Sequence, residues 1–402
     1  MGMKPSDYDI LTDASIEQIR SVFKPKKVKV VGKTFEICLI NNIEVAPARG
    51  KTNASFFPEQ DLAMRDFTIN SMAYEPGTDN IIDLFAGKKD LENKIVRFTN
   101  NPYNRIEEDP LRMIRACRFA SQINGEIEPL SKIAILKNHG LIKSKVSFER
   151  IRLEILKSMN HKAPSLFFKS LYETGLLQYI FPSVARCFDL DGGPYHGETV
   201  FEHSMITGDS ISSKYPLLRL AGYLHDAGKY DAVSRKNGRI SFAGHENHTD
   251  MIKSDLEKLR FSNREIQYLL SIVAVHMRPL TEETTPKSVR KILQTLHQYN
   301  IDYHDFLRIR IADKKGNLAK DPYTFSEIKL RLKKILQEIN PDKENAFTLK
   351  DLQVSGRDIM KILNINQGTK VGQILDSLLE RVIKDPGLNS RVMLEKIILE
   401  YK

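Results

Sequence analysis

The amino-acid sequence predicts an α+β fold in which a small mixed β-sheet comes first and helices form the remainder of the chain. Segments with the alternation or the β-branched composition of strands are confined to residues 1–98. Beyond Asp109 these patterns nearly vanish, and apolar residues recur at helical spacing. We therefore expect a mixed α/β domain at residues 1–98 and helical domains at residues 99–180, 195–320 and 345–402.

The composition is that of a globular protein with a surplus of positive charge. Of the 402 residues, 41% are hydrophobic and 28% are charged, and the formal net charge is +10. Such a surplus favours a polyanionic partner, most simply nucleic acid. No apolar run approaches the roughly 18 residues that a membrane-spanning helix requires, so we expect no membrane association. The three scattered cysteines predict neither a disulfide framework nor a metal site, which favours the reducing cytoplasm.

The first domain is expected to contain one early helix and several short strands. Residues 15–19 have the pattern of a helix start. Residues 27–31 and 35–40 alternate or run like strands, with Gly32 as a turn signal between them. A further strand-like segment, Ile43-Glu44-Val45, carries an acidic side chain.

Two carboxylates one residue apart, Asp7 and Asp9, are the most informative feature of this domain. Alternate side chains of an extended strand point to the same face, so these two would lie side by side. Such a pair suits a shared divalent cation, which two-metal phosphoryl transfer uses to align a triphosphate with an attacking hydroxyl. The alternative interpretation is a solvated Asp-x-Asp pair in a loop.

The helical domains are predicted from apolar spacing and from helix-breaking residues. Pro110 is acceptable in the first turn of a helix, and Gly368 and Pro386-Gly387 interrupt the pattern near the C-terminus. The expected helices lie at residues 110–120, 146–160, 163–180, throughout the histidine-rich block 195–320, and at 348–401.

Six short motifs follow one another in an order that suggests a family. They are Asp7-Tyr8-Asp9, Ile43-Glu44-Val45, Met64-Arg65-Asp66-Phe67-Thr68-Ile69-Asn70, Asp83-Leu84-Phe85-Ala86-Gly87, Glu108-Asp109-Pro110-Leu111-Arg112 and Ser147-Phe148-Glu149-Arg150-Ile151. Their order and spacing resemble the class II tRNA nucleotidyltransferase and bacterial poly(A) polymerase family over residues 2–180, and more loosely beyond. The resemblance implies a nucleotidyltransferase head, then a helical neck, a further helical domain and a tail.

The same resemblance implies a role for each matching residue. Mg²⁺ would be bound in the head by the catalytic carboxylates Asp7 and Asp9, with Glu44 as their neighbour. The implied nucleotide-binding residues are Arg65, Asp66, Asn70, Glu108, Asp109 and Arg112, and the implied RNA-binding residues are Glu149 and Arg150. The basic face of the helix that carries Arg112 adds Arg115 as a further nucleotide-binding candidate and Arg118 as a further RNA-binding candidate.

Some of these residues have a simpler interpretation. Arg115 and Arg118 extend the basic face of one helix, and such a face contacts either phosphate or solvent. Glu149 and Arg150 alternatively belong to a surface ion pair beside Arg152 and Glu154.

Asp109 and Arg112 also have a direct chemical interpretation as a base template. Three residues apart on a helix, they would share one face. Asp offers acceptors and Arg offers only donors. Cytosine and adenine both present an amino donor beside a ring-nitrogen acceptor, whereas guanine and uracil would leave buried groups unpaired at a high cost. The alternative is a helix-capping acid beside an exposed arginine.

Six of the ten histidines fall between His196 and His276. The string Leu220–Lys229 is an apolar helix that ends in adjacent His and Asp residues, and it resembles the HD phosphohydrolase superfamily. That resemblance implies metal ligands at His203, His225, Asp226 and Asp313, with His245 and His276 serving a second metal or phosphate. His248 competes with His245 for this role, and His196 is a further candidate.

Imidazole nitrogen and carboxylate oxygen together suit Mn, Fe, Co, Ni or Zn, and Mg²⁺ is a further candidate for this HD site. A metal there would lower the pKa of its bound water and so supply hydroxide for phosphoester cleavage. The alternatives are core histidines with satisfied hydrogen bonds, or a degenerate HD domain kept for packing or for holding tRNA.

The sequence also departs from the family it resembles. The family opens with a strand and a Gly-Gly-x-Val-Arg-Asp segment before the Asp pair, whereas here only Gly2-Met3-Lys4-Pro5-Ser6 precedes it. We therefore expect an N-terminally incomplete head. The segment between Arg49 and Asp66 is shorter than the family's flexible loop, and Met64 replaces an arginine. Nucleotidyl transfer, especially the final A addition, is expected to suffer.

The expected function is the addition of C and A, from CTP and ATP, to tRNA 3′ ends in the cytoplasm by metal-dependent nucleotidyl transfer, with an HD phosphohydrolase domain behind the head. The alternatives are a poly(A) polymerase, an HD phosphohydrolase with a vestigial head, and a non-catalytic RNA-binding protein. The oligomeric state does not follow from the sequence.

Overall fold

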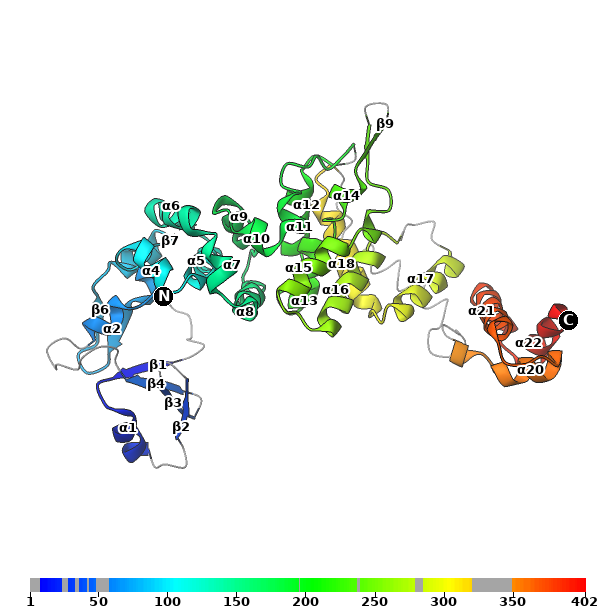
Figure 1. Cartoon of the computed structure of the whole chain (residues 1–402), viewed down its shortest axis with the longest axis horizontal. Helices are drawn as coiled ribbons and strands as arrows, with labels where there is room; N and C mark the ends of the chain where they lie inside the picture. Colours follow the sequence, from blue (N-terminus) through cyan, green and yellow to red (C-terminus); the bar gives the residue numbers. More distant parts are fainter. Residues whose placement is uncertain are drawn as a thin grey trace. The chain divides into compact units, whose positions relative to one another are not determined.

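The computed structural model describes residues 8–23, 28–32, 36–41, 43–47, 58–194, 196–236, 239–278, 285–319 and 349–402. The chain divides into two compact units, one formed by Met1–Ser147 with Lys169–Leu176 and the other by Phe148–Phe168 with Leu177–Lys402. In Figure 1 the first unit is blue to cyan, the histidine-rich helices are green to yellow, and the C-terminal helices are orange to red. Among the described residues, no helix has the length and apolar character needed to cross a membrane.

The first unit begins with a four-stranded mixed sheet. Its strand order is β1 (Asp9–Thr12), β4 (Ile43–Pro47), β3 (Ile37–Ile40) and β2 (Val28–Val31). The β1–β4 pair is parallel and the other two pairs are antiparallel. Helix α1 (Ile16–Phe23) connects β1 to β2, and its buried Ile19 belongs to the same small core as the sheet residues Val28, Cys38, Ile40 and Val45.

The remainder of the first unit is mostly helical. It also contains a hairpin of β5 (Met72–Glu75) and β6 (Asn80–Asp83), and a parallel pair of β7 (Ile95–Val96) and β8 (Glu126–Ile127). The helices are α2 (Glu59–Ala63), the 3-10 turn η2 (Thr68–Asn70), α3 (Gly87–Glu92), α4 (Pro102–Glu108), α5 (Leu111–Ile123), α6 (Pro129–Asn138) and α7 (Leu141–Lys145).

The second unit contains the histidine-rich helices. They are α8 (Phe148–Ser158), α10 (Leu177–Ile180), α11 (Pro182–Ala185), α12 (Val200–Asp209), α13 (Pro216–Leu224), α14 (Lys229–Ala232), η3 (His245–Asn247), α15 (Asp250–Lys258), α16 (Asn263–Val275), α17 (Pro286–Gln298) and α18 (Tyr303–Gly316), while α9 (Ser165–Glu173) is divided between the two units. An antiparallel pair of strands, β9 (Ser234–Lys236) and β10 (Arg239–Ser241), interrupts the region predicted to be wholly helical.

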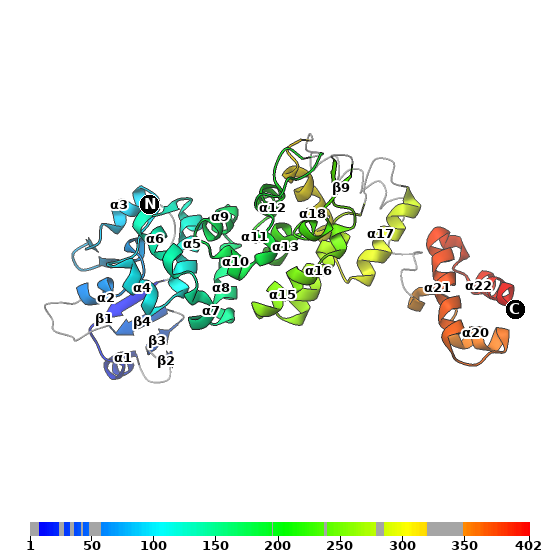
Figure 2. The same cartoon turned by 45° about the horizontal axis from the view of Figure 1, so that its top comes forward.

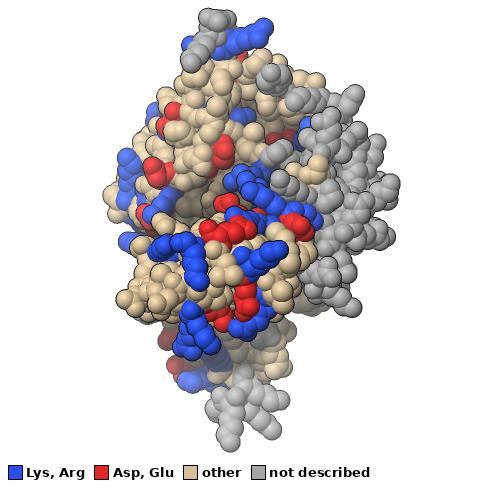
Figure 3. All heavy atoms as spheres, turned by 90° about the vertical axis from the view of Figure 1, so that its right-hand side faces the viewer, with Lys and Arg blue, Asp and Glu red and all other residues tan. Residues whose placement is uncertain are grey.

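The C-terminal helices have their own apolar core. They are η4 (Leu349–Asp351), α20 (Gly356–Leu363), α21 (Thr369–Lys384), η5 (Pro386–Leu388), α22 (Arg391–Ile398) and η6 (Leu399–Tyr401). Gly368 precedes α21 and Pro386 follows it, so both predicted interruptions are confirmed. The core is formed chiefly by Ile359, Ile374, Leu378, Val382, Leu394 and Ile398. On the face in Figure 3, Lys and Arg side chains are interspersed with Asp and Glu.

The predicted α+β class, with a small mixed sheet followed by helices, is therefore confirmed.

Helices α12, α13, α16 and α18 lie together in the second unit (Figures 1 and 2). Three glycines allow the close crossings. A Cβ on Gly208 of α12 would fall 2.4 Å from ring atoms of the fully buried Tyr223 on α13, and one on Gly222 would fall 3.0 Å from the Gly208 Cα. A Cβ on Gly316 of α18 would fall 2.4 Å from Thr207 Oγ1. No larger residue fits these crossings unchanged.

We expect the Gly208→Ala substitution to lower the free energy of unfolding of the second unit by about 1–3 kcal/mol, because overpacking forces side chains out of their rotamers. Urea unfolding followed by circular dichroism measures the change. The matched control is Gly372→Ala on the exposed face of α21, where a Cβ meets nothing within 4 Å. There alanine should add up to about 1 kcal/mol through helix propensity. Equal effects of the two substitutions would contradict the tight crossing.

Candidate functional site

Two acidic residues face one another on the head sheet. Asp9 on β1 pairs in register with Glu44 on the adjacent parallel strand β4, and both side chains are exposed. Residues paired in this way on adjacent strands point to the same face of the sheet. Asp7 lies outside the described residues. Among the predicted catalytic carboxylates, the described pair therefore forms an exposed acidic site that suits a hard divalent cation.

Asp66 is the centre of a small polar network in the first unit. Its Oδ1 accepts a hydrogen bond from Asn70 Nδ2 at 3.1 Å, and its Oδ2 lies 2.7 Å from Arg115 Nε and 2.6 Å from Arg115 Nη2. Arg65 instead pairs with Asp61, at 2.9 Å between Nε and Oδ2. Two predicted nucleotide-binding residues, Asn70 on η2 and Arg115 on α5, thus contact a third, Asp66, which lies just before η2. Arg65 directly precedes Asp66 in the chain.

A second network joins the end of α4 to the start of α5. Arg112 Nη1 donates to Glu108 Oε2 at 2.7 Å and to the Arg105 carbonyl at 2.9 Å. Arg105 donates to Glu108 Oε1 at 2.9 Å and to the Met64 carbonyl at 3.2 Å. Arg105 was not predicted to be a site residue. Its place three residues before Glu108 on one helix was the available signal, because residues at that spacing share a face.

The prediction that Asp109 and Arg112 share one helix is wrong. Asp109 ends α4 in an extended conformation, with φ −150° and ψ 98°, and α5 begins only at Leu111. The reason is Pro110, whose ring excludes the helical conformation for the residue before it. The Asp109 carboxylate accepts the Leu111 N–H at 3.2 Å, so the two template candidates lie on either side of a junction between helices.

The predicted RNA contacts differ in exposure. Arg118 is only 7% exposed, and its guanidinium carbon lies 4.0 Å from the Phe119 ring centroid, so the expected open basic face does not extend to it. Glu149 and Arg150 are exposed on α8. The alternative interpretation is confirmed in part, because exposed Glu149 lies 3.9 Å from Arg260 Nε, and Arg152 donates to the Arg260 carbonyl.

The second unit brings together all six predicted HD residues, and all but Asp313 are buried. His203 lies on α12, His225 and Asp226 follow α13, His245 is in η3, His276 follows α16, and Asp313 is on α18. The six side chains form what we call the histidine–aspartate cluster.

Asp226 divides this cluster into two halves. Its Oδ2 lies 3.5 Å from His203 Nε2 and 3.4 Å from His225 Nε2, while its Oδ1 lies 2.9 Å from His245 Nε2 and 3.5 Å from His276 Nε2. Asp313 Oδ1 joins the first half at 3.1 Å from His203 Nε2. The cluster therefore offers two adjacent groups of ligands that share one carboxylate, which is the arrangement a pair of metal ions requires.

The hydrogen bonds of the rings indicate which nitrogens carry lone pairs. Nδ1 of His225, His245 and His276 each lies 2.6–3.0 Å from the backbone carbonyl three residues earlier, to which it donates. In a neutral ring this leaves Nε2 as the acceptor. Yet the Nε2 atoms of His245 and His276 are only 3.2 Å apart, as are those of His203 and His225. Facing lone pairs at this distance require a proton or a cation between them, so these residues fit a bound metal.

Electrostatics in the cluster agree with this requirement. Burial raises the pKa of Asp226, but the charges of His225 and Lys229 outweigh it and hold that pKa well below its usual range. Burial lowers the pKa of His203, whereas the hydrogen bond with Asp313 and the nearby Glu198 carboxylate raise it to about 10. Burial lowers the pKa of His276. Without a metal, the carboxylates therefore hold protons on some of the same nitrogens that a metal would bind.

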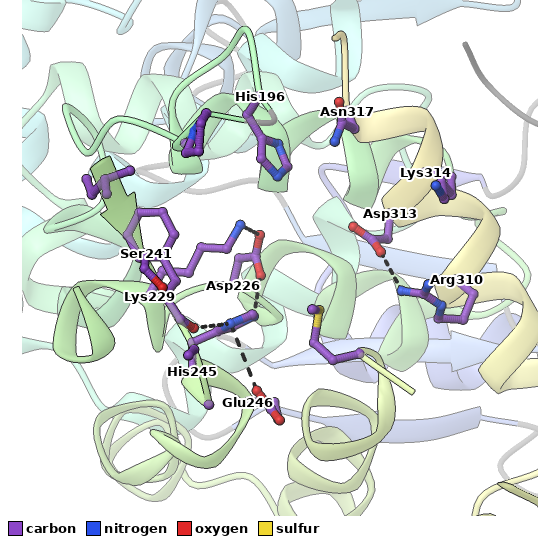
Figure 4. Close-up of a pocket in the computed structure, with 17 residues that line it drawn as sticks. His196, Asp226, Lys229, Ser241, His245, Glu246, Arg310, Asp313, Lys314 and Asn317 are labelled. Atoms are coloured by element: carbon purple, nitrogen blue, oxygen red, sulfur yellow. Dashed lines mark hydrogen bonds and ion pairs between the residues drawn. The ribbon is translucent and has the colours of Figure 1, made fainter. Parts of the chain in front are cut away.

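A cavity of about 530 Å³ opens beside the cluster, and Asp226, His245 and Asp313 form part of its wall (Figure 4). Lys229 Nζ lies 2.7 Å from Asp226 Oδ2, and Arg310 Nη1 lies 2.8 Å from Asp313 Oδ2. The remaining wall includes apolar side chains such as those of Ile240 and Phe242. A cavity with cations and potential metal ligands on one side and apolar groups on the other suits a phosphoester with an organic substituent.

His196 also lines this cavity, next to a buried carboxylate that sequence reasoning missed. His196 Nδ1 lies 2.7 Å from Glu198 Oε1, and the two residues form a further potential ligand group with His203. His248, the predicted competitor of His245, is exposed rather than within the cluster.

Comparison with known proteins gives three matches to family models, in order along the chain. The model described as Poly A polymerase head domain matches residues 1–97. The model described as probable RNA and SrmB-binding site of polymerase A matches residues 126–188. The model described as tRNA nucleotidyltransferase domain 2, putative, matches residues 242–398.

Individual proteins agree with these models. The chain is 25% identical over 347 residues to the A-adding tRNA nucleotidyltransferase of Deinococcus radiodurans, an alignment that covers 82% of this chain and 78% of that enzyme. It is 32% identical over 222 residues to poly(A) polymerase I of Escherichia coli, with 48% of this chain and 46% of that enzyme covered. Its fold matches the CCA-adding enzyme of Bacillus stearothermophilus solved with CTP, with a TM-score of 0.67 and 20% identity, over 100% of this chain and 89% of that one.

The three matched models follow one another along the chain in the same order as the head sheet and the helices behind it. Along most of its length and in the same order of domains, the chain is therefore similar to tRNA nucleotidyltransferases and bacterial poly(A) polymerases.

Proposed function

We propose that this protein adds C and A, from CTP and ATP, to the 3′ end of tRNA. The observation that carries the proposal is the pairing of Asp9 with Glu44 within a sheet that the polymerase head model matches. These carboxylates, together with Asp7, would hold Mg²⁺, which neutralises triphosphate charge and lowers the pKa of the attacking hydroxyl. The names of the D. radiodurans and B. stearothermophilus proteins support tRNA as the acceptor.

The other predicted residues then receive their roles from the two networks of the first unit. Asp66, Asn70 and Arg115 hold the sugar and phosphates of the incoming nucleotide. Asp109 and Arg112 present an acceptor and donors to the base, and Glu108 fixes the guanidinium of Arg112. Glu149 and Arg150, exposed on α8, are the proposed RNA contacts, whereas Arg118 would have to leave its buried place to touch RNA. The three buried free cysteines are compatible with a reducing cytoplasm.

The reaction is tested with radiolabelled tRNA transcripts that end before CCA or after CC. We expect CTP to extend the first transcript and ATP to complete both. Asp9→Asn should slow incorporation by at least about 100-fold, because several kcal/mol of charge stabilisation disappear with the metal site. The control is Asp13→Asn, at an exposed carboxylate beyond the end of β1. Long A tracts without C would favour poly(A) synthesis, and extension of the CC transcript alone would indicate an A-adding enzyme.

Base selection is tested separately at Arg112. We expect Arg112→Ala to reduce the preference for CTP over UTP by about 10–100-fold, because a lost buried hydrogen bond is worth about 1–3 kcal/mol. Competition between the two nucleotides in single-addition assays measures this preference. Glu107→Gln, at the exposed neighbour of Glu108, is the matched control. An unchanged preference in the Arg112 variant would exclude its template role.

We also propose a second activity, metal-dependent phosphoester hydrolysis at the histidine–aspartate cluster. The observation that favours it is the pair of facing Nε2 contacts at 3.2 Å around Asp226. The first half of the cluster would hold one ion through His203, His225, Asp226 and Asp313, and the second half another through His245 and His276. Mn, Fe, Co, Ni, Zn and Mg²⁺ are the candidate ions. A bound ion would lower the pKa of its water and so supply the nucleophile. Lys229 and Arg310 are placed to neutralise phosphate.

We expect the metal-free chain to hydrolyse p-nitrophenyl phosphate or its diester only after a divalent metal is added. Asp226→Asn should abolish hydrolysis and leave nucleotide incorporation intact, whereas Asp9→Asn should do the reverse. At 100 times its dissociation constant, the metal should also stabilise the chain by about 2.7 kcal/mol, which thermal unfolding detects. If neither hydrolysis nor stabilisation occurs with any of the candidate metals, this second activity is wrong. Hydrolysis without nucleotide incorporation would indicate a vestigial head. RNA binding without either reaction would indicate a non-catalytic RNA-binding protein.

A further inference from the structure

Three of the four histidines in the histidine–aspartate cluster have their outward nitrogen fixed by the backbone. His225 Nδ1 lies 2.8 Å from the Gly222 carbonyl, and His276 Nδ1 lies 2.6 Å from the Val273 carbonyl. Both histidines directly follow a helix, where the last carbonyls have no partner within the helix and are free to accept. His245 Nδ1 uses a loop carbonyl in the same way, at 3.0 Å. No side chain is needed to orient these rings.

His203 is in a different position. It lies within α12, where its own N–H bonds to the Thr199 carbonyl in the regular helical pattern. The ring therefore has no free helix-end carbonyl three residues earlier. Among the described residues its buried Nδ1 has no hydrogen-bond partner of good geometry, and Glu198 Oε1 lies 3.3 Å from it. His203 thus differs from His245, whose Nδ1 donates to the Phe242 carbonyl at 3.0 Å and lies farther, at 4.0 Å, from the nearby carboxylate of Glu246.

The Glu198 side chain is buried, and both of its carboxylate oxygens have close partners. Its side chain is only 2% exposed. Oε1 lies 2.7 Å from His196 Nδ1 as well as near His203, and Oε2 accepts the N–H groups of Gly197 at 3.0 Å and of Leu318 at 3.1 Å. The Leu318 contact ties the segment before α12 to the segment after α18, the helix that carries Asp313. One carboxylate therefore links both elements that supply the first half of the cluster.

Two glycines leave room for this arrangement. A Cβ on Gly316 would fall 2.9 Å from His203 Nδ1. A Cβ on Gly192 would fall 2.4 Å from the Glu198 carbonyl oxygen and 2.7 Å from His196 Cβ. The contact between carboxylate and imidazole thus depends on close backbone approach from both neighbouring segments.

Glu198 could alternatively be a metal ligand with His196 and His203, because the three ligand atoms lie within 4.8 Å of one another. Two contacts argue against this. Oε2 already accepts two backbone N–H groups, and a ligand at His203 Nδ1 would have to share the ring whose Nε2 already faces His225, Asp226 and Asp313. A carboxylate that lies behind a metal-binding imidazole and orients it is the simpler arrangement.

We propose that Glu198 is the positioning residue for His203, and that it directs Nε2 of this ring into the first half of the cluster. The inference rests on the proposed metal-dependent activity. Carboxylates of this kind fix the tautomer and the orientation of the ring, and their loss weakens metal binding by about 10–100-fold. Because His245 and His276 are oriented by backbone carbonyls, Glu198 should influence only the half formed by His203, His225 and Asp313. The same oxygen also fixes His196 at the wall of the cavity.

The test is a cobalt titration of the full chain, with d–d absorption and isothermal calorimetry as readouts that do not depend on activity. Two backgrounds separate the halves of the cluster: His245→Ala disables the second half and His203→Ala the first. In the His245→Ala background, Glu198→Gln should weaken cobalt binding 10–100-fold, and Glu198→Asp should restore part of the loss. In the His203→Ala background, Glu198→Gln should leave the remaining site unchanged. Glu257→Gln, at an exposed carboxylate of α15, is the charge-matched control.

The possible failures are distinguishable. If the unsubstituted chain binds no cobalt, manganese or nickel, the proposed metal centre and this inference both fall. If it binds metal but Glu198→Gln leaves affinity in the His245→Ala background unchanged, only the role of Glu198 is wrong. An equal loss in both backgrounds would likewise overturn selective positioning, since it indicates general destabilisation. Thermal unfolding monitors folding of each variant, and Glu198→Asp replaces Glu198→Gln as the test variant if the latter does not fold.

Discussion

The organisation of the second unit depends on the charge of one buried carboxylate. Asp226 is 2% exposed, and four imidazole Nε2 atoms lie 2.9–3.5 Å from its oxygens, with Lys229 Nζ at 2.7 Å. A buried carboxylate without compensation is very costly, so these contacts are a condition of folding as well as a possible active site. Neutral rings would provide little of that compensation, because their lone pairs would face one another in pairs, whereas the proton that raises the charge of His203 provides part of it. A cation in each half removes both problems at once.

This requirement explains the close helix crossings. His203, His225 and Asp313 come from α12, the end of α13 and α18, and their ligand atoms meet only if those helices approach closely. Gly208, Gly222 and Gly316 stand at the contacts where any Cβ would collide. Both the close packing of the helices and the geometry of the ligand atoms therefore require glycine at these three positions. These glycines are required by the short distance between the helices. Their backbone conformation does not require glycine, since each lies within a helix.

How much could be predicted from the sequence differed between the two sites. The adjacent His225 and Asp226 at the end of an apolar helix, in the order of a known superfamily, led to all six residues that the structure brings together. Glu198 was not found, because its burial and its hydrogen bond from the Leu318 N–H, 120 residues away, are tertiary features that its position in the sequence does not disclose. Arg118 fits a basic helical stripe, but tertiary packing buries it against Phe119. The position of Asp109 could have been predicted, because Pro110 disfavours a helical conformation for the residue before it. The prediction instead relied on the helical spacing of Asp109 and Arg112.

The position of Asp109 changes how base selection would work in the proposed transfer reaction. If Asp109 and Arg112 shared one helix, their separation would be fixed by helical geometry alone. Instead, Asp109 lies on the junction before α5, while Arg112 is held from the side of α4 by Glu108 and the Arg105 carbonyl. Arg105 in turn is anchored to the Met64 carbonyl, next to the Arg65–Asp66 segment. The donors and the acceptor that the proposed reaction would offer to a base are therefore positioned by two separate sets of contacts. Because one set reaches the segment that would bind the nucleotide's sugar and phosphates, a shift of that segment would move the Arg112 donors relative to the Asp109 acceptor.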